Sequence, residues 1–219
     1  MIKAVIFDLD GTLLYTIEDI RDCMNEFLKK NNFPEHSEEK YCRFVGDGVE
    51  DLIKRAVPKE YINEDILRDA LDFFRKDYRV RWRVNTRPYE GIPDLVEKLK
   101  ENNFLVAVLS NKPHEFTVTM VNEIFGNDYF EEIQGGVKGF PLKPDPFTVN
   151  KLLEKLKLSP EETVFVGDSD IDILTARNYG AKSIGVSWGF RGREELENTG
   201  ADFIAEKPED ILDFIKKQK

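Results

Sequence analysis

Residues 5–12 read Val5-Ile6-Phe7-Asp8-Leu9-Asp10-Gly11-Thr12. The apolar start, rich in β-branched residues, predicts a β-strand that is buried on both faces. Two aspartates and a glycine follow it, and buried carboxylates are costly unless a metal or a hydrogen-bond network pairs them. Open α/β sheets place their chemistry at the carboxyl ends of such strands. The stretch therefore predicts a magnesium-dependent enzyme.

The composition is that of a globular protein: of 219 residues, 41% are hydrophobic and 34% are charged. The net charge of −10 disfavours nucleic acid as a partner. We expect no membrane span, because no apolar run approaches the required length. The only cysteines, Cys23 and Cys42, fit no metal or redox motif and are expected to be free thiols. These features predict a cytoplasmic protein.

Strand and helix patterns alternate along most of the chain. Further strands are predicted at 104–109, 163–166, 182–186 and, more weakly, 201–205. Helical patterns lie between and after them, at 91–102, 115–125, 145–158, 171–179 and 208–217. This order is typical of βαβ units, so we predict a doubly wound α/β fold with a parallel sheet.

One stretch interrupts the alternation. Residues 18–84 contain only helical periodicity, and one apolar stripe begins just before them and includes Ile17, Ile20 and Met24. An insert of this length is too long for a βα connection. We therefore predict a helical cap at residues 15–88 and an α/β core made of residues 1–14 and 89–219. Its two connections, at 13–16 and 85–89, are the candidate hinge.

Polar residues also follow the other predicted strands. The second strand stops at Ser110-Asn111, a loop carries Lys143 before a proline, and a later strand ends at Asp168. If the first strand lies between the strands that end at Ser110 and Asp168, all of these groups meet Asp8 and Asp10 at one edge of the sheet.

Phosphoryl transfer is the chemistry that suits this set. Asp8 is the candidate nucleophile, because a carboxylate can attack phosphorus and form an aspartyl-phosphate. Mg²⁺ would bridge the two anions, held by the side chains of Asp8 and Asp168 and the backbone carbonyl of Asp10. The Asp10 carboxylate is then free to act as general acid and base.

The phosphate itself needs donors and positive charge. Gly11 allows the turn that aims backbone N–H groups at the phosphate, and Thr12 is expected to brace this loop. Ser110 and Asn111 are expected to donate to phosphate oxygens. Lys143 is expected to offset the charge that develops on the phosphoryl group.

These motifs, in this order and with a helical insert after the first, resemble the haloacid dehalogenase superfamily, and within it the phosphoglycolate phosphatases. The resemblance covers essentially the whole chain. It implies that Asp172 supports the metal site, often without touching the metal. It also implies that the cap loop around Gly46 and Gly48 selects the leaving group. Arg43 is a candidate cap cation for a substrate carboxylate, as are Lys54 and Arg55, although an exposed charge on a helix face is the safer interpretation of each.

The predicted function is hydrolysis of a small phosphorylated metabolite, with 2-phosphoglycolate as the leading substrate, by a monomer or homodimer. A phosphosugar mutase similar to β-phosphoglucomutase, and a pyrophosphate or nucleotide phosphatase, use the same core and stay open as alternatives. A non-catalytic phospholigand-binding protein is disfavoured, because Asp8 and Asp10 are both present.

A second motif would indicate a different chemistry, but the rest of the sequence does not support it. Residues 185–189, Gly-Val-Ser-Trp-Gly, match the nucleophile elbow of serine hydrolases. That chemistry needs a histidine later in the chain, and none follows His114. We therefore expect Gly189 and Gly192 only to shape a loop.

Overall fold

The computed structural model describes residues 1–218. Six strands form the main sheet: β1 (Ala4–Phe7), β4 (Leu105–Pro113), β5 (Glu132–Gly136), β6 (Thr163–Gly167), β7 (Lys182–Val186) and β8 (Phe203–Ala205). Their order is β5-β4-β1-β6-β7-β8, and every neighbouring pair is parallel. The predicted parallel sheet is confirmed, and β1 lies between the two strands expected beside it.

The central strand is apolar throughout. All four residues of β1 are buried, and Phe7 pairs with Val108 on β4 and with Val166 on β6. The three strands are therefore in register where β1 ends. This register brings the residues that follow Phe7 beside those that follow β6 and those at the end of β4.

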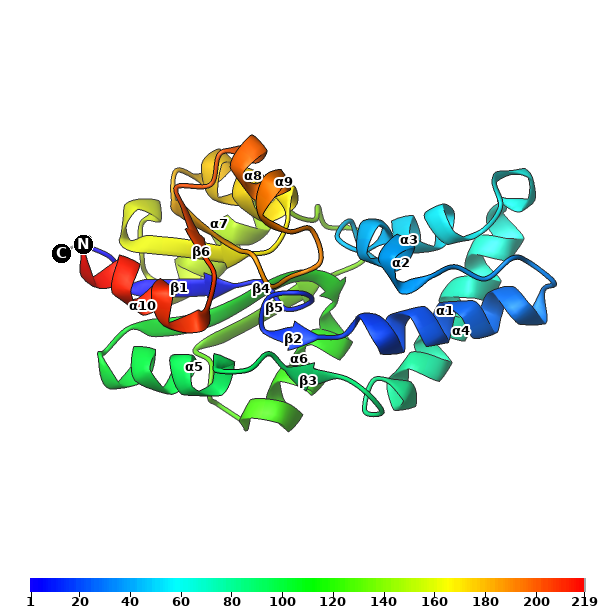
Figure 1. Ribbon diagram of the computed structural model, residues 1–219, viewed down its shortest axis with the longest axis horizontal. Helices are drawn as coiled ribbons and strands as arrows, with labels where there is room; N and C mark the ends of the chain where they lie inside the picture. Colours follow the sequence, from blue (N-terminus) through cyan, green and yellow to red (C-terminus); the bar gives the residue numbers. More distant parts are fainter. Residues whose placement is uncertain (219) are drawn as a thin grey trace.

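Helices cover both faces of the sheet, as a doubly wound fold requires. They are α5 (Ile92–Glu101), α6 (His114–Phe125), α7 (Pro146–Leu156), α8 (Asp170–Tyr179), α9 (Arg193–Thr199) and α10 (Pro208–Lys216). Side chains alternate along β1, so Ile6 packs with the residues of α7 and α8 while Phe7 packs with those of α5 and α6. Figure 1 shows α7 and α8 above the sheet and α5 below it.

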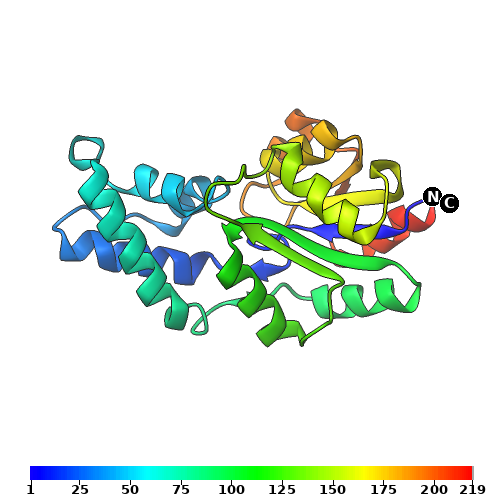
Figure 2. The ribbon, with the colours of Figure 1, turned by 180° about the vertical axis from the view of Figure 1, so that it is seen from behind.

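Four further helices form the cap: α1 (Ile17–Lys30), α2 (Glu38–Phe44), α3 (Val49–Ala56) and α4 (Glu64–Arg81). Figures 1 and 2 show them grouped at one end of the sheet, with both termini at the opposite end. The predicted stripe on α1 is buried, with Ile17, Ile20 and Met24 at most 2% exposed. No helix within residues 1–218 is long and apolar enough to cross a bilayer.

A short ribbon joins the cap to the core. Strands β2 (Leu14–Tyr15) and β3 (Arg87–Pro88) pair antiparallel at the two predicted connections. Beside them, the buried carboxylate of Asp19 accepts hydrogen bonds of 2.7–3.0 Å from the backbone and side chains of Asn85 and Thr86. The limits 15–88 for the cap, and the hinge at its ends, remain our proposed division of the chain.

Several elements differ from the sequence predictions. Helix α9 and the short strands β2 and β3 were not predicted. β5 has the sequence Glu-Ile-Gln-Gly-Gly and was not predicted, because it shows no apolar alternation. β4 was expected to end at residue 109, yet it continues to Pro113 past an irregularity in its pairing with β5. The longer strand brings Ser110, Asn111 and Lys112 into the sheet edge.

Candidate active site

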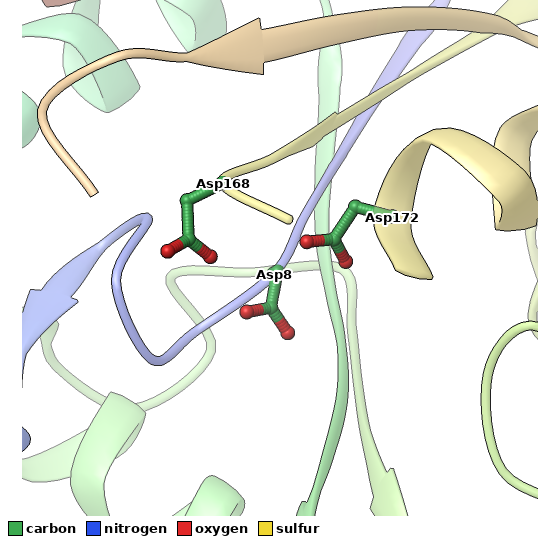
Figure 3. Close-up of side chains that lie close together, drawn as sticks. All are labelled: Asp8, Asp168 and Asp172. Atoms are coloured by element: carbon green, nitrogen blue, oxygen red, sulfur yellow. The ribbon is translucent and has the colours of Figure 1, made fainter. Parts of the chain in front are cut away.

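Three carboxylates converge at the carboxyl end of the sheet. Asp8 follows β1, Asp168 follows β6, and Asp172 lies in the first turn of α8. One oxygen from each lies within 4.8 Å of the others, and all three residues are buried. Figure 3 shows the three side chains close together, each from a separate element. Residues far apart in the chain therefore form a single acidic cluster.

Lys143 is the cation that reaches this cluster. Its Nζ lies 2.6 Å from Asp8 Oδ1 and 2.8 Å from Asp172 Oδ1, and its side chain is only 3% exposed. Burial acts to lower the pKa of Lys143, but the charges of Asp172 and Asp8 outweigh it and hold the pKa above its usual value. Lys143 therefore stays charged.

The cluster holds more negative charge than Lys143 compensates. Burial raises the pKa of Asp8 to about 7, although the attraction of Lys143 opposes the shift. Burial, followed by repulsion from Asp172 and Asp8, raises the pKa of Asp168 well above its usual range. With all three acids ionised, three carboxylates face one ammonium. The two excess negative charges match a divalent cation.

The contacts of the cluster also suit a hard cation. Asp172 Oδ2 accepts from the backbone N and the Oγ of Ser169, and Asp172 Oδ1 contacts Lys143, so both of its oxygens are engaged. Asp8 Oδ2 and Asp168 Oδ1 have no hydrogen-bond partner among the described residues. Carboxylate oxygens are the ligands that Mg²⁺ prefers. The donor set therefore fits Mg²⁺, with Asp8 and Asp168 free to ligate and Asp172 behind them.

Glycines let the chain approach this cluster closely. Gly11 has φ +83°, and a Cβ there would lie 2.3 Å from Asp168 Oδ2. A Cβ on Gly189 would lie 2.2 Å from the Cβ of Asp168, and the next residue, Phe190, donates its backbone N–H to Asp168 Oδ2 at 2.6 Å. The sequence predicted only that Gly189 shapes this loop. The loop also fixes the position of Asp168, a candidate metal ligand.

Asp10 stands apart from the acidic cluster. Lys112 Nζ lies 3.0 and 3.1 Å from its two carboxylate oxygens, and the same Nζ donates to the Tyr78 hydroxyl at 3.0 Å. The Asp10 carboxylate is thus held by a lysine and is not directed at the other acids. This separation agrees with a role in proton transfer, because it leaves the carboxylate free of metal.

The predicted phosphate-binding residues occupy different environments. Ser110 lines the cavity between the core and the cap, and Gly11 and Thr12 are not among its lining residues. The Thr12 hydroxyl is buried without a partner among the described residues, and the Thr12 carbonyl accepts from Trp188 Nε1 at 3.2 Å. Asn111 Nδ2 donates to the carbonyls of Lys143 and Gly46, at 3.0 and 2.8 Å. Asn111 therefore ties the Lys143 loop and the cap to the sheet.

The cap closes over these groups. A cavity of about 50 Å³ lies between the two parts, and its core side includes Asp8, Asp10, Ser110 and Lys143. The cap residues that line it are apolar or glycine: Ile20, Val45, Gly46, Gly48, Val49, Leu52 and Phe74.

The candidate cap cations lie outside this cavity. Arg43 is exposed, Lys54 pairs with Glu50, and Arg55 pairs with Asp47. None of these three basic side chains lines the cavity. The two glycines predicted to select the leaving group do line it, so the cap side of the cavity is formed by an uncharged surface.

Comparison with known proteins identifies the family. The haloacid dehalogenase-like hydrolase family matches residues 5–186. The chain belongs to this family. A phosphoglycolate phosphatase of Aquifex aeolicus is 32% identical to this hydrolase and covers 97% of the chain and 96% of the relative. One from Vibrio vulnificus is 30% identical over 98% of the chain and 96% of the relative.

Solved structures agree with the assignment. The crystal structure of a protein from Haemophilus somnus, described as a predicted phosphoglycolate phosphatase, superposes with a TM-score of 0.91. It is 29% identical to the hydrolase and covers 98% of each chain. The expected family, the α/β fold and the enzyme class, a phosphoric monoester hydrolase, are confirmed.

Sequence reasoning missed two cations of the hydrolase's site, Lys112 and Arg191, which both line the cavity. Arg191 Nη2 donates to the Val45 carbonyl at 2.9 Å and so links the loop after β7 to the cap. The signal for Lys112 was its place two residues after Ser110, which on a regular strand is the same face. Nothing in the sequence around Arg191 distinguishes it from an exposed loop arginine.

Proposed function

We propose that this chain hydrolyses a small phosphomonoester in a Mg²⁺-dependent reaction, through an aspartyl-phosphate on Asp8. The observation that carries the proposal is the position of Asp8. Its carboxylate lies at the cavity wall, 2.6 Å from the Lys143 ammonium and within reach of Asp168 and Asp172. A nucleophilic carboxylate needs this setting, in which positive charge offsets the repulsion between two anions.

The residues divide the work as follows. An Asp8 oxygen forms the bond to phosphorus while the bond to the leaving oxygen breaks, and Asp10 gives that oxygen a proton. Asp10 then takes a proton from the water that attacks phosphorus, which releases phosphate and restores the Asp8 carboxylate. Lys143 holds Asp8 in place and stabilises charge on the phosphoryl oxygens. Mg²⁺ held by Asp8, Asp168 and the Asp10 carbonyl would supply further positive charge at the phosphate.

We propose 2-phosphoglycolate as the leading substrate. The relatives from Vibrio vulnificus and Aquifex aeolicus, which are 30% and 32% identical to this chain over nearly its whole length, are named phosphoglycolate phosphatases. The small volume of the cavity also favours a small leaving group, because about 50 Å³ holds only a few water-sized groups. A phosphosugar would need the cap to move further away. A cytoplasmic location and a monomeric or dimeric state stay predictions from the sequence.

A panel of phosphate esters tests the proposal. With Mg²⁺ present, 2-phosphoglycolate should release phosphate with a higher kcat/KM than hexose phosphates, pyrophosphate or nucleoside monophosphates. Asp8→Asn should lower kcat by roughly 1000-fold or more, as expected for loss of a nucleophile. Asp213→Asn, at an exposed site on α10, is the matched control. Substantial activity in Asp8→Asn would remove the proposed nucleophile, and isomer formation faster than phosphate release would favour a mutase.

A further inference from the structure

Lys112 is a buried lysine whose ammonium contacts both an acid and a tyrosine. Its side chain is 3% exposed, and its Nζ contacts both oxygens of Asp10 and the hydroxyl of Tyr78. The Tyr78 ring stacks on Phe74 at 4.8 Å and meets Phe116 edge-on at 5.3 Å. The ammonium is therefore fixed in position at the cavity wall by an acid of the core and a tyrosine of the cap.

Lys112 lies near the place where the leaving group of the substrate is expected to bind. In the proposed reaction Asp10 donates its proton to the leaving oxygen, so that oxygen must lie within hydrogen-bond distance of Asp10. Lys112 Nζ contacts the same carboxylate, 3.0 and 3.1 Å from its two oxygens. Atoms attached one or two bonds beyond the leaving oxygen therefore come within reach of the ammonium.

Few other groups can recognise charge there. The cap residues that line the cavity are apolar or glycine, so within residues 1–218 the cap contributes no charged side chain to it. The core contributes three cations: Lys112, Lys143 and Arg191. Lys143 is engaged by Asp8 and Asp172 at the nucleophile.

Arg191 is also partly engaged. Its Nη2 donates to the Val45 carbonyl, and its Nε lies 3.8 Å from Glu195. Lys112 carries three N–H donors, two of which contact Asp10 and one Tyr78. Because two donors go to the same carboxylate, one of them can turn to a substrate without breaking the pair with Asp10.

Resting on the proposed function, we infer that Lys112 determines specificity by binding an anionic group on the leaving side of the substrate, a carboxylate one carbon away from the ester oxygen. One ammonium hydrogen turns from Asp10 to the incoming carboxylate, while the others keep Asp10 and Tyr78 in place. The apolar cap excludes water from this contact, which strengthens it. Selection for a short, acidic leaving group thus comes from the core, and the cap limits the size.

Two substrates of equal length test this inference. 2-Phosphoglycolate and ethyl phosphate share the phosphate, the ester oxygen and the adjoining carbon, and differ in carboxylate against methyl. The measured quantity is the ratio of their kcat/KM values with Mg²⁺ present. The native enzyme should prefer 2-phosphoglycolate. Lys112→Met should reduce this preference by roughly 10- to 100-fold, as expected for the loss of a charge-assisted hydrogen bond.

Controls separate specificity from positioning. Lys112→Arg keeps the positive charge and should keep most of the preference, and Lys98→Met, at an exposed site on α5, should keep all of it. If Lys112→Met lowers both kcat/KM values by the same factor, Lys112 only positions Asp10 and the inference is wrong. If Arg191→Met removes the preference while Lys112→Met keeps it, Arg191 is the recognising cation and the inference is equally wrong.

The failure of the proposed function looks different from these outcomes. Absence of phosphate release from both esters by the native enzyme would overturn the proposed phosphatase itself. Release from both with equal kcat/KM would leave the phosphatase standing and overturn the assignment of Lys112. A variant counts as folded if its circular dichroism spectrum matches that of the native enzyme and its Tm lies within a few degrees of the native Tm.

Discussion

Asn111 of the core and Gly46 of the cap are joined directly: Asn111 Nδ2 donates a 2.8 Å hydrogen bond to the Gly46 carbonyl. The same amide donates to the Lys143 carbonyl, and its Oδ1 accepts from the Lys143 backbone N at 2.7 Å. One side chain therefore fixes the loop that carries the cation of the site and the cap loop that closes over it. The position of the cap and the position of Lys143 are coupled through Asn111.

Replacing Asn111 should weaken cap closure. Asn111→Ala removes three hydrogen bonds, two of them within the core. We expect KM to rise roughly tenfold, the effect of about 1.4 kcal/mol of lost binding, because the closed state that contacts the substrate becomes less populated. Steady-state kinetics would measure this. Asn122→Ala on α6 is the control, and an unchanged KM in Asn111→Ala would show that the cap closes without this contact.

Gly189 should not tolerate a side chain. A Cβ there would lie 2.2 Å from the Asp168 Cβ and 2.6 Å from the Gly11 carbonyl oxygen, both parts of the site core. Gly189→Ala should therefore displace Asp168 and lower Mg²⁺ affinity by 10- to 100-fold or about 1.4–2.8 kcal/mol. Titration of activity with Mg²⁺ would measure this loss.

The same loop offers a matched control. Gly192 has φ +77°, but a Cβ there would meet nothing within 4 Å. Gly192→Ala should therefore cost about 1 kcal/mol of stability through backbone strain and leave Mg²⁺ affinity unchanged. Equal Mg²⁺ affinities for Gly189→Ala and Gly192→Ala would contradict the role given to the close approach at Asp168.

The sheet and the acidic residues could be predicted because their signals are local. The apolar run before Asp8 gave β1, and the strand ending before Asp168 gave β6, so the meeting of the two carboxylates followed from parallel pairing. β5 carried no such signal. It forms a strand because the edge of β4 is free, and its glycines are needed for close packing: a Cβ on Gly135 would lie 2.6 Å from the His114 Cα.

The missed cations have a related explanation. Lysine and arginine are exposed in most proteins, so a sequence pattern assigns Lys112 and Arg191 to the surface. Their burial depends on partners that are distant in the chain, Tyr78 for Lys112 and the Val45 carbonyl for Arg191. The cap was predicted as a helical insert, but which of its residues face the cavity is set by tertiary packing that periodicity does not contain.

Asp19 should matter for stability more than for chemistry. Its buried carboxylate accepts four hydrogen bonds from Asn85 and Thr86, which hold the returning connection against α1. Asp19→Ala would leave these buried donors without an acceptor and should cost about 3 kcal/mol of unfolding free energy, or roughly 6–12 °C in Tm for a chain of this size. Asp22→Ala, on the same helix with a half-buried partner in Arg21, should cost about 0.5 kcal/mol. Similar Tm values for the two variants would contradict the stabilising role given to the hydrogen bonds of Asp19.

Stability without metal should fall as pH rises. The raised pKa values of Asp8, about 7, and of Asp168 mean that the folded protein disfavours their ionised forms. Their contribution to stability is therefore fully present below the ordinary aspartate pKa and is lost as pH rises, for Asp8 through about 7. Mg²⁺ requires the ionised carboxylates, so its binding should restore what is lost.

The measurable consequence is a pH-dependent effect of Mg²⁺ on Tm. Saturating Mg²⁺ should raise Tm more at about pH 8 than at about pH 5.5, where protons compete with the metal for Asp8 and Asp168. Thermal unfolding at both pH values, with and without Mg²⁺, would show this. Asp168→Asn should abolish most of the increment at the higher pH, whereas Asp213→Asn should preserve it. An increment that is equal at the two pH values, or larger at about pH 5.5, would mean that these buried carboxylates do not form the metal site.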